Sequence, residues 1–122
     1  MSETPPRRRV HSGAPWEAQV GYCRAIQAGN HISVSGTAPV AEDGSVHAPG
    51  DGYEQAKRCL QIALAALAEL DADASHVVRT RMFVTDILTR PSYAEMVGAT
   101  KQSLALQTRI ERCYLNSSSP LA

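Results

Sequence analysis

The sequence has few of the residues that build disulfide frameworks or metal centres. Its 122 residues include only three cysteines, Cys23, Cys59 and Cys113. They form no CxxC or CxxH pair, and an odd number at wide spacing argues against disulfides and a structural zinc site. The four histidines are equally scattered and show no metal-ligand spacing. We therefore expect no metal site, and we expect the thiols of Cys23 and Cys59 to pack as small apolar groups.

The chain also lacks a long apolar run and an excess of charge of either sign. Its longest apolar run, residues 62–68, is too short to span a bilayer. The N-terminus has no apolar segment typical of a signal peptide. Twelve basic residues balance twelve acidic ones, so no overall field attracts nucleic acid or an acidic membrane. These absences predict a cytoplasmic protein with no nucleic-acid and no membrane partner.

What is present suits one ordinary globular domain. Hydrophobic residues make up 43% of the chain and charged residues 20%, and 122 residues can form a single core. Residues 1–8 contain two prolines and two of three consecutive arginines, and we expect a disordered, solvated arm there. Residues 9–11 have the pattern of a short edge strand.

Two short alternating runs flank Gly29-Asn30 and predict a hairpin, because Gly and Asn tolerate the positive φ of a tight turn. The expected strands cover roughly residues 20–27 and 31–35. In the second run Ile32 and Val34 alternate with polar residues, which is typical of a sheet with one buried face. This run ends in Ser35-Gly36, a hydroxyl followed by bare backbone. Such a pair can hold a small ligand, because glycine lets the ligand approach the main chain.

A helix is predicted after a turn-rich segment at residues 38–50. Asp51 can cap its N-terminus, with Glu54 three residues later. The apolar residues that follow recur at helical spacing and form one stripe. The stripe consists of Ala56, Leu60, Ala63, Leu64, Leu67 and Leu70. We expect the helix to end near Leu70-Asp71.

Residues 76–87 predict a strand, whose alternation divides its side chains between two faces. Toward the helix we expect Val78, Thr80, Met82 and Val84. On the opposite face we expect Arg79, Arg81, Phe83 and Thr85. Two arginines beside a phenylalanine suit a face covered by a second subunit or an anionic ligand; a solvated antiparallel face is the alternative. A second helix is expected after Pro91.

In this order of elements the chain resembles the RidA/YjgF reactive-intermediate deaminase family over about residues 9–98. The matching segments are Val20-Gly21-Tyr22, Ala28-Gly29-Asn30, residues 34–40 and residues 77–86. Residues 12–17 are similar to a divergent branch of that family. The resemblance implies an α+β, chorismate-mutase-like fold in one domain over residues 1–122, with a curved mixed sheet and two helices packed on one face. It also implies a homotrimer with clefts between the subunits.

The resemblance further implies hydrolysis of reactive 2-imino and enamino acids to 2-keto acids and ammonia, without a cofactor. Tyr22 matches the family's cleft tyrosine, and its catalytic role would be to orient substrate or water. Ser35 and Gly36 match the pair that binds the ligand carboxylate. Arg79 and Arg81 are further substrate-binding candidates, since a guanidinium group can bind both carboxylate oxygens. The structural alternatives are a packed strand tyrosine, a serine-glycine pair that only ends a strand, and two solvated arginines.

Residues 99–122 do not match the family pattern. Deaminating members carry an arginine in a Pro-Ala-Arg context and a closing Glu-Ile-Glu-Ala segment, and both are absent here. Arg109 and Arg112 lie at about the right distance along the chain but in a different context. True divergence and a frame-shifted or truncated end both produce such a pattern. The sequence thus predicts a RidA-like hydrolase, fully active, weakened or inactive. The alternative is a non-enzymatic, small-carboxylate-binding or regulatory member of the same fold.

Overall fold

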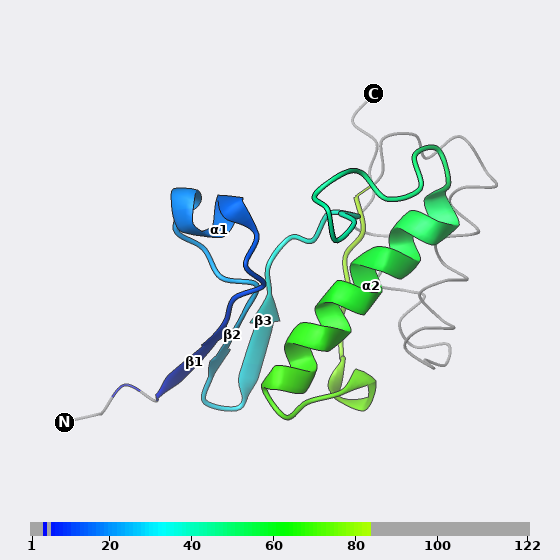
Figure 1. The fold of residues 1–122 in the computed structure, drawn as a ribbon. Helices are drawn as coiled ribbons and strands as arrows, with labels where there is room; N and C mark the ends of the chain where they lie inside the picture. The colour runs from blue at the N-terminus through cyan, green and yellow to red at the C-terminus, as the bar shows by residue number, and fades with distance from the viewer. Residues whose placement is uncertain (1–3, 5, 84–122) are drawn as a thin grey trace.

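A three-stranded antiparallel sheet lies beside one long helix in the computed structural model of the chain, which describes residue 4 and residues 6–83 (Figure 1). The elements are β1 (Arg7–Val10), α1 (Pro15–Val20), β2 (Ala25–Ala28), β3 (His31–Val34), α2 (Gly52–Glu69) and a 3₁₀ helix, η1 (Ala74–His76). The strands are ordered β1-β2-β3, and the register places Gln27 opposite Arg8 and Ile32. The helix expected after Pro91, and residues 99–122, lie outside the described residues.

The hairpin between β2 and β3 confirms the predicted turn and the predicted second strand. Gly29 takes a φ of 60° in the two-residue loop, at the position where hairpin turns favour glycine. Ile32 and Val34 are half-buried and alternate with exposed residues. The sequence pattern therefore placed the buried face of β3 correctly.

The predicted first strand of the hairpin, residues 20–27, starts too early. A short helix, α1, occupies its beginning, because Pro15 suits a first helical position and the carboxylate of Glu17 lies in the first turn. Gly21 ends this helix with a left-handed conformation at φ 84°, and its N–H donates to the Glu17 carbonyl at 2.9 Å. A glycine taken as part of a strand is thus a helix cap, and β2 begins only at Ala25.

β1 begins inside the segment that was expected to be a disordered arm. Arg7 and Arg8 both pair with β2. The guanidinium of Arg8 also donates to the carbonyl of Glu69 at 3.2 Å and to the carboxylate of Asp71 at 3.3 Å. A cation is favourable at the C-terminal end of a helix, where carbonyl groups lack partners. The prediction of disorder is therefore wrong for these two arginines, while their predicted exposure is confirmed.

Helix α2 follows its prediction closely. The carboxylate of Asp51 caps it by accepting from the Glu54 N–H at 3.1 Å. Near the other end, Ala66 and Leu70 pack with Val10 and Ala25 to form the buried core between helix and sheet. Ala66 was not part of the predicted stripe, whereas the stripe residues Leu60, Ala63 and Leu64 are only half-buried. The core thus lies between the sheet and the C-terminal end of α2.

Residues 77–83 are not a strand, contrary to the prediction. Each N–H and C=O of a strand needs a ladder partner, and no described strand pairs with this segment. The segment runs along α2 (Figure 1). Met82 from this segment packs against Ala56 of α2. Val78, predicted to face the helix, is 84% exposed. Arg79, Arg81 and Phe83 are exposed, as the alternation requires; the remainder of the predicted strand lies beyond the described residues.

Candidate functional site

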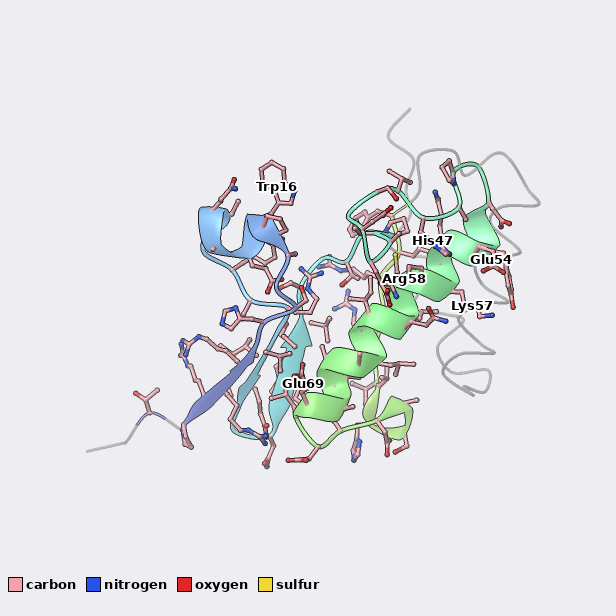
Figure 2. The ribbon with its side chains drawn as sticks, viewed as in Figure 1. Trp16, His47, Glu54, Lys57, Arg58 and Glu69 are labelled. Atoms are coloured by element: carbon pink, nitrogen blue, oxygen red, sulfur yellow. The ribbon has the colours of Figure 1, made fainter. Side chains whose placement is uncertain are left out.

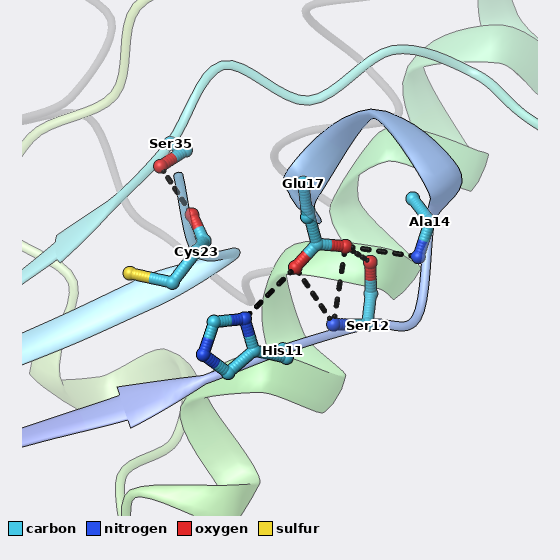
Figure 3. Close-up of polar contacts among 6 residues, drawn as sticks. All are labelled: His11, Ser12, Ala14, Glu17, Cys23 and Ser35. Carbon is cyan, nitrogen blue, oxygen red and sulfur yellow. Dashed lines mark hydrogen bonds and ion pairs between the residues drawn. The ribbon is translucent and has the colours of Figure 1, made fainter. Parts of the chain in front are cut away.

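The ends of the hairpin bring together three of the residues that the sequence singled out. The Ser35 N–H donates to the Arg24 carbonyl at 3.0 Å, which holds the chain after β3 beside the chain before β2. The Ser35 hydroxyl donates to the Cys23 carbonyl at 2.7 Å (Figure 3). Tyr22 therefore lies near Ser35 and Gly36, although they are more than ten residues apart in sequence.

Arg24 joins these residues, and sequence reasoning missed it. It is 7% exposed, and its Nη1 donates to the Gly36 carbonyl at 3.0 Å and to the Thr37 hydroxyl at 3.1 Å. Its guanidinium carbon lies 5.5 Å from the centre of the Tyr22 ring, within cation–π range. The only sequence signal was a charged residue directly before the apolar start of β2. We call Tyr22, Arg24, Ser35, Gly36 and Thr37 the Arg24 cluster.

Glu17 is a buried carboxylate held by the loop before α1. It accepts hydrogen bonds from the backbone N–H and hydroxyl of Ser12 and from the N–H of Ala14 (Figure 3). The Nδ1 of His11 lies 3.6 Å from its Oε1. Through these contacts the carboxylate of Glu17 holds the loop before α1 in place around it.

The charge state of Glu17 follows from these contacts. Burial by itself raises the pKa of the carboxyl group, but the hydrogen bonds from Ser12 and Ala14 and the positive charge of Arg24 outweigh it. The pKa of Glu17 is therefore lowered, and the group is an anion at neutral pH. It provides a counter-charge for Arg24 without a direct ion pair.

The other two predicted binding residues lie apart from the Arg24 cluster. Arg79 and Arg81 are exposed, and the guanidinium of Arg81 lies 5.8 Å from the ring of Phe83. Within residues 6–83, no hydrogen bond, ion pair or ring contact joins either arginine to Tyr22, Ser35 or Gly36. Their predicted role as carboxylate partners therefore stays a prediction.

An open depression lies between the 38–50 segment and α2, away from these residues. It is lined by Ala41, Glu42, Asp43, His47, Arg58 and Gln61, and Figure 2 shows His47 and Arg58 in this region. Two of its charged groups, Arg58 and Asp43, already have structural partners. Arg58 Nε donates to the Val40 carbonyl at 2.7 Å, and Asp43 accepts from the N–H and hydroxyl of Ser45. The depression therefore reflects how the segment is tied to α2.

Metal-ligating groups do not gather in the part of the chain that the structure describes, where no three His, Cys, Asp or Glu side chains are placed to hold an ion. Cys23 and Cys59 are free and half-buried. Burial raises the pKa of the Cys59 thiol, which keeps it protonated. Among the same residues, no helix has the length and apolarity needed to cross a membrane.

Comparison with known proteins identifies the family. The family model described as "Endoribonuclease L-PSP" matches residues 12–115. This chain belongs to the RidA/YjgF family. The match confirms the resemblance carried by the hairpin and by residues 77–86.

Solved structures of RidA/YjgF proteins share the fold. A Mycobacterium tuberculosis protein of the YjgF/YER057c/UK114 family superposes with a TM-score of 0.68 at 31% identity, covering 82% of this chain and 75% of that one. A putative endoribonuclease of Thermotoga maritima gives a TM-score of 0.65 at 20% identity, covering 90% and 80%. The α+β fold class is thereby confirmed.

Two curated relatives match over a shorter stretch. An uncharacterized protein of Streptomyces coelicolor is 41% identical over 75 residues, which cover 62% of this chain and 55% of the relative. Protein DfrA of Myxococcus xanthus is 35% identical over 83 residues, covering 66% and 63%. The matched part of the chain thus spans less than two thirds of either relative's length.

Proposed function

We propose that this RidA/YjgF protein binds small 2-keto and 2-imino acids at the Arg24 cluster and hydrolyses reactive imino and enamino acids there. The observation that carries the proposal is that the Tyr22 ring and the Gly36 carbonyl both contact one buried guanidinium, while the Ser35 hydroxyl bonds the neighbouring Cys23 carbonyl. Gly36 is exposed, and a Cβ built on it would meet no atom within 4 Å. A ligand therefore has room to approach the main chain at this point.

The hydrogen bonds around the cluster suggest a role for each group. The N–H of Gly36 is a donor for the substrate carboxylate. The proton of the Ser35 hydroxyl is engaged by the Cys23 carbonyl, so its oxygen is left as an acceptor for an imine N–H or a water. The Tyr22 hydroxyl would orient the attacking water. Water then adds to the imine carbon, the carbon–nitrogen bond breaks, and 2-keto acid and ammonia leave.

The homotrimer implied by the family resemblance belongs to this proposal. Exposed apolar side chains offer surface for subunit contacts: Trp16 and Val20 on α1, and Val78 and Phe83 on the other side of the molecule. Trp16 projects away from the sheet and α2 (Figure 2). In a trimer Arg79 or Arg81 of one subunit would reach the carboxylate bound by another. Light scattering coupled to size-exclusion chromatography would give the subunit number.

A specific observation favours the non-enzymatic alternative. Hydrolysis needs a group that accepts a proton from water, and Glu17 is a carboxylate that interacts electrostatically with Arg24. Its oxygens already accept from Ser12 and Ala14. A small-carboxylate-binding or regulatory protein would need the guanidinium and the free backbone but no such base.

One experiment separates the two functions. Stopped-flow measurement of 2-iminopropanoate hydrolysis should show a rate above that of buffer. Tyr22→Phe should lower this rate about a hundredfold, at the lower end of the range of one acid–base contribution. A hydrolysis rate equal to that in buffer alone, together with a melting temperature of the protein raised by pyruvate, would instead support the non-enzymatic, carboxylate-binding function. No turnover and no thermal shift across 2-keto acids would contradict both. A single-stranded RNA probe should stay intact, since the chain has no net positive charge.

A further inference from the structure

We propose that Arg24 is a positioning residue of the carboxylate site, and that it aims two successive backbone N–H groups, those of Gly36 and Thr37, at the ligand. The inference rests on the proposed function and deepens it. The ligand class is a small carboxylate such as a 2-keto acid. Arg24 acts from behind the turn and does not itself touch the ligand.

The orientation of the two N–H groups follows from peptide geometry. The described peptide bonds are all trans, so the C=O and N–H of one peptide unit point in opposite directions. Arg24 Nη1 holds the Gly36 carbonyl at 3.0 Å, which turns the Thr37 N–H away from the guanidinium. The Thr37 hydroxyl, itself bound by Arg24, donates to the Ser35 carbonyl at 2.8 Å. This second contact turns the Gly36 N–H away from the same side.

Both N–H groups are available. Neither donates a hydrogen bond to any residue in the described part of the chain. Successive backbone N–H groups on one side of a turn form a concavity that binds anions. The open space beside Gly36 admits a ligand there.

The charge of Arg24 supports the same conclusion. Its Nε is buried and has no hydrogen-bond partner within residues 6–83, and none of their carboxylates forms an ion pair with it. A buried cation without a direct partner is costly. A bound anion on the far side of the Gly36–Thr37 peptide would offset this cost through the positive potential of the guanidinium.

The test compares a charged ligand with a neutral one of the same shape. Affinities of the full-length chain for pyruvate and for its methyl ester are measured by calorimetry, for the unmodified protein and for Arg24→Gln, Arg24→Lys and Thr37→Val. The matched control is Arg9→Gln, which removes the same charge from an exposed position on β1. Amide resonances of Gly36 and Thr37 are followed by NMR during the pyruvate titration.

We expect Arg24→Gln to weaken pyruvate binding at least tenfold and ester binding less than twofold. Arg24→Lys should retain part of the affinity, Thr37→Val should lose two- to fivefold, and Arg9→Gln should bind like the unmodified chain. The Gly36 and Thr37 amide signals should shift most with pyruvate. Thr37→Val keeps the guanidinium, so it tests the orientation even where Arg24→Gln does not fold.

Other results overturn the inference in distinguishable ways. Equal losses for pyruvate and ester would show that Arg24 only supports the fold. The role of Arg24 would be refuted if Arg24→Gln bound pyruvate as tightly as the unmodified protein does. It would also be refuted if pyruvate shifted only the amide signals of residues other than Gly36 and Thr37. Either result would leave the proposed function intact. If the unmodified chain binds neither ligand, the proposed function fails and this inference fails with it.

Discussion

The two ends of helix α2 rest on very different supports. At the C-terminal end, Ala66 and Leu70 pack into a core made with Val10 and Ala25 of the sheet. At the N-terminal end, Ala56 is buried mainly by Tyr53 and by Met82 from the 77–83 segment, which has no ladder partner among the described strands. Among the described residues, the helix thus faces a buried core at its C-terminal end and the extended 77–83 segment at its N-terminal end.

This difference separates a part of the chain whose polar groups find partners within it from a part that exposes large apolar side chains. On the sheet side, strand pairing, the Arg8 contacts with the helix end and the Glu17 loop satisfy most polar groups internally. On the other side, Val78 and Phe83 expose large apolar surfaces. We therefore expect changes in the core between the sheet and α2 to alter the stability of the chain, and changes at the exposed side chains of residues 77–83 to alter its association.

The largest effect should come from Leu70→Ala, which removes a side chain that is 4% exposed in the main core. The loss of buried contacts and the cavity left behind should lower the free energy of unfolding by about 3 kcal/mol. Urea denaturation at pH 7 measures it. The control Val20→Ala changes an exposed side chain and should cost less than about 0.5 kcal/mol. Similar losses in both variants would contradict the assignment of the core.

Glu17→Gln should be the next most damaging change. The amide keeps one acceptor oxygen but presents an NH₂ group where the second oxygen accepts from the Ser12 N–H, and it removes the charge that strengthens the remaining hydrogen bonds from Ser12 and Ala14. We expect a loss of about 2 kcal/mol in the free energy of unfolding at pH 7. Glu42→Gln, at an exposed position, is the matched control.

The pH dependence of this difference follows from the lowered pKa of Glu17. A carboxyl group with a lower pKa in the folded state contributes stability above its unfolded pKa. That contribution is lost as the pH falls below the ordinary value of 4.5 and through the lowered one. The gap between unmodified protein and Glu17→Gln should therefore narrow below pH 4.5 and be constant near neutrality. A gap independent of pH would refute the anionic role.

Met82→Ala tests the weaker end of α2. The side chain is half-buried and packs against Ala56, so less apolar surface is lost than at Leu70. We expect a loss of about 1 kcal/mol in the free energy of unfolding, measured by the same urea titration. A loss as large as that of Leu70→Ala would mean that the two ends of the helix are equally supported, against the comparison drawn above.

Arg8→Ala should have a smaller effect, because its contacts with Glu69 and Asp71 are exposed to solvent. Cations at a helix C-terminus and surface ion pairs are each worth about 0.5 kcal/mol. Thermal unfolding at low salt should show this loss, and 1 M NaCl should remove most of it. Arg9→Ala, next to it on β1, serves as control and should be neutral.

Phe83→Ser should change the stability of the isolated chain least, by less than about 0.5 kcal/mol, because the ring is exposed. Its effect should be on association: light scattering should show a smaller assembly at a given protein concentration. A large loss of stability that does not depend on protein concentration would instead place Phe83 in the core of the single chain.

Local signals in the sequence were enough to predict several elements. The cap at Asp51, the helix that follows it and the turn at Gly29 depend on neighbours within four residues, and the structure has all three. Gly21 was misassigned because a glycine can lie in a strand or end a helix. The choice depends on whether Pro15 and Glu17 start a helix before it.

The candidate site was predictable only in part. The family-like segments pointed to Tyr22, Ser35 and Gly36, which the structure brings together. They did not point to Arg24, because its burial and its partners twelve and thirteen residues away appear only once β2 and β3 pair. The sequence also offered Arg79 and Arg81 as partners for the ligand carboxylate, and the structure shows both exposed. Alternation along a segment does not reveal which of its faces is covered.

The amino-acid sequence by itself determined the helix, the hairpin turn and the family, since these depend on short-range spacing and on ordered motifs. Only the tertiary structure decided that Arg24, which the sequence did not single out, would be buried at the centre of the candidate site. It also decided that residues 77–83 would lie along α2 with no partner among the described strands. The physical reason is the same in both cases. Burial and hydrogen-bond pairing depend on which distant segments meet, and a residue's own neighbours in the chain do not specify that.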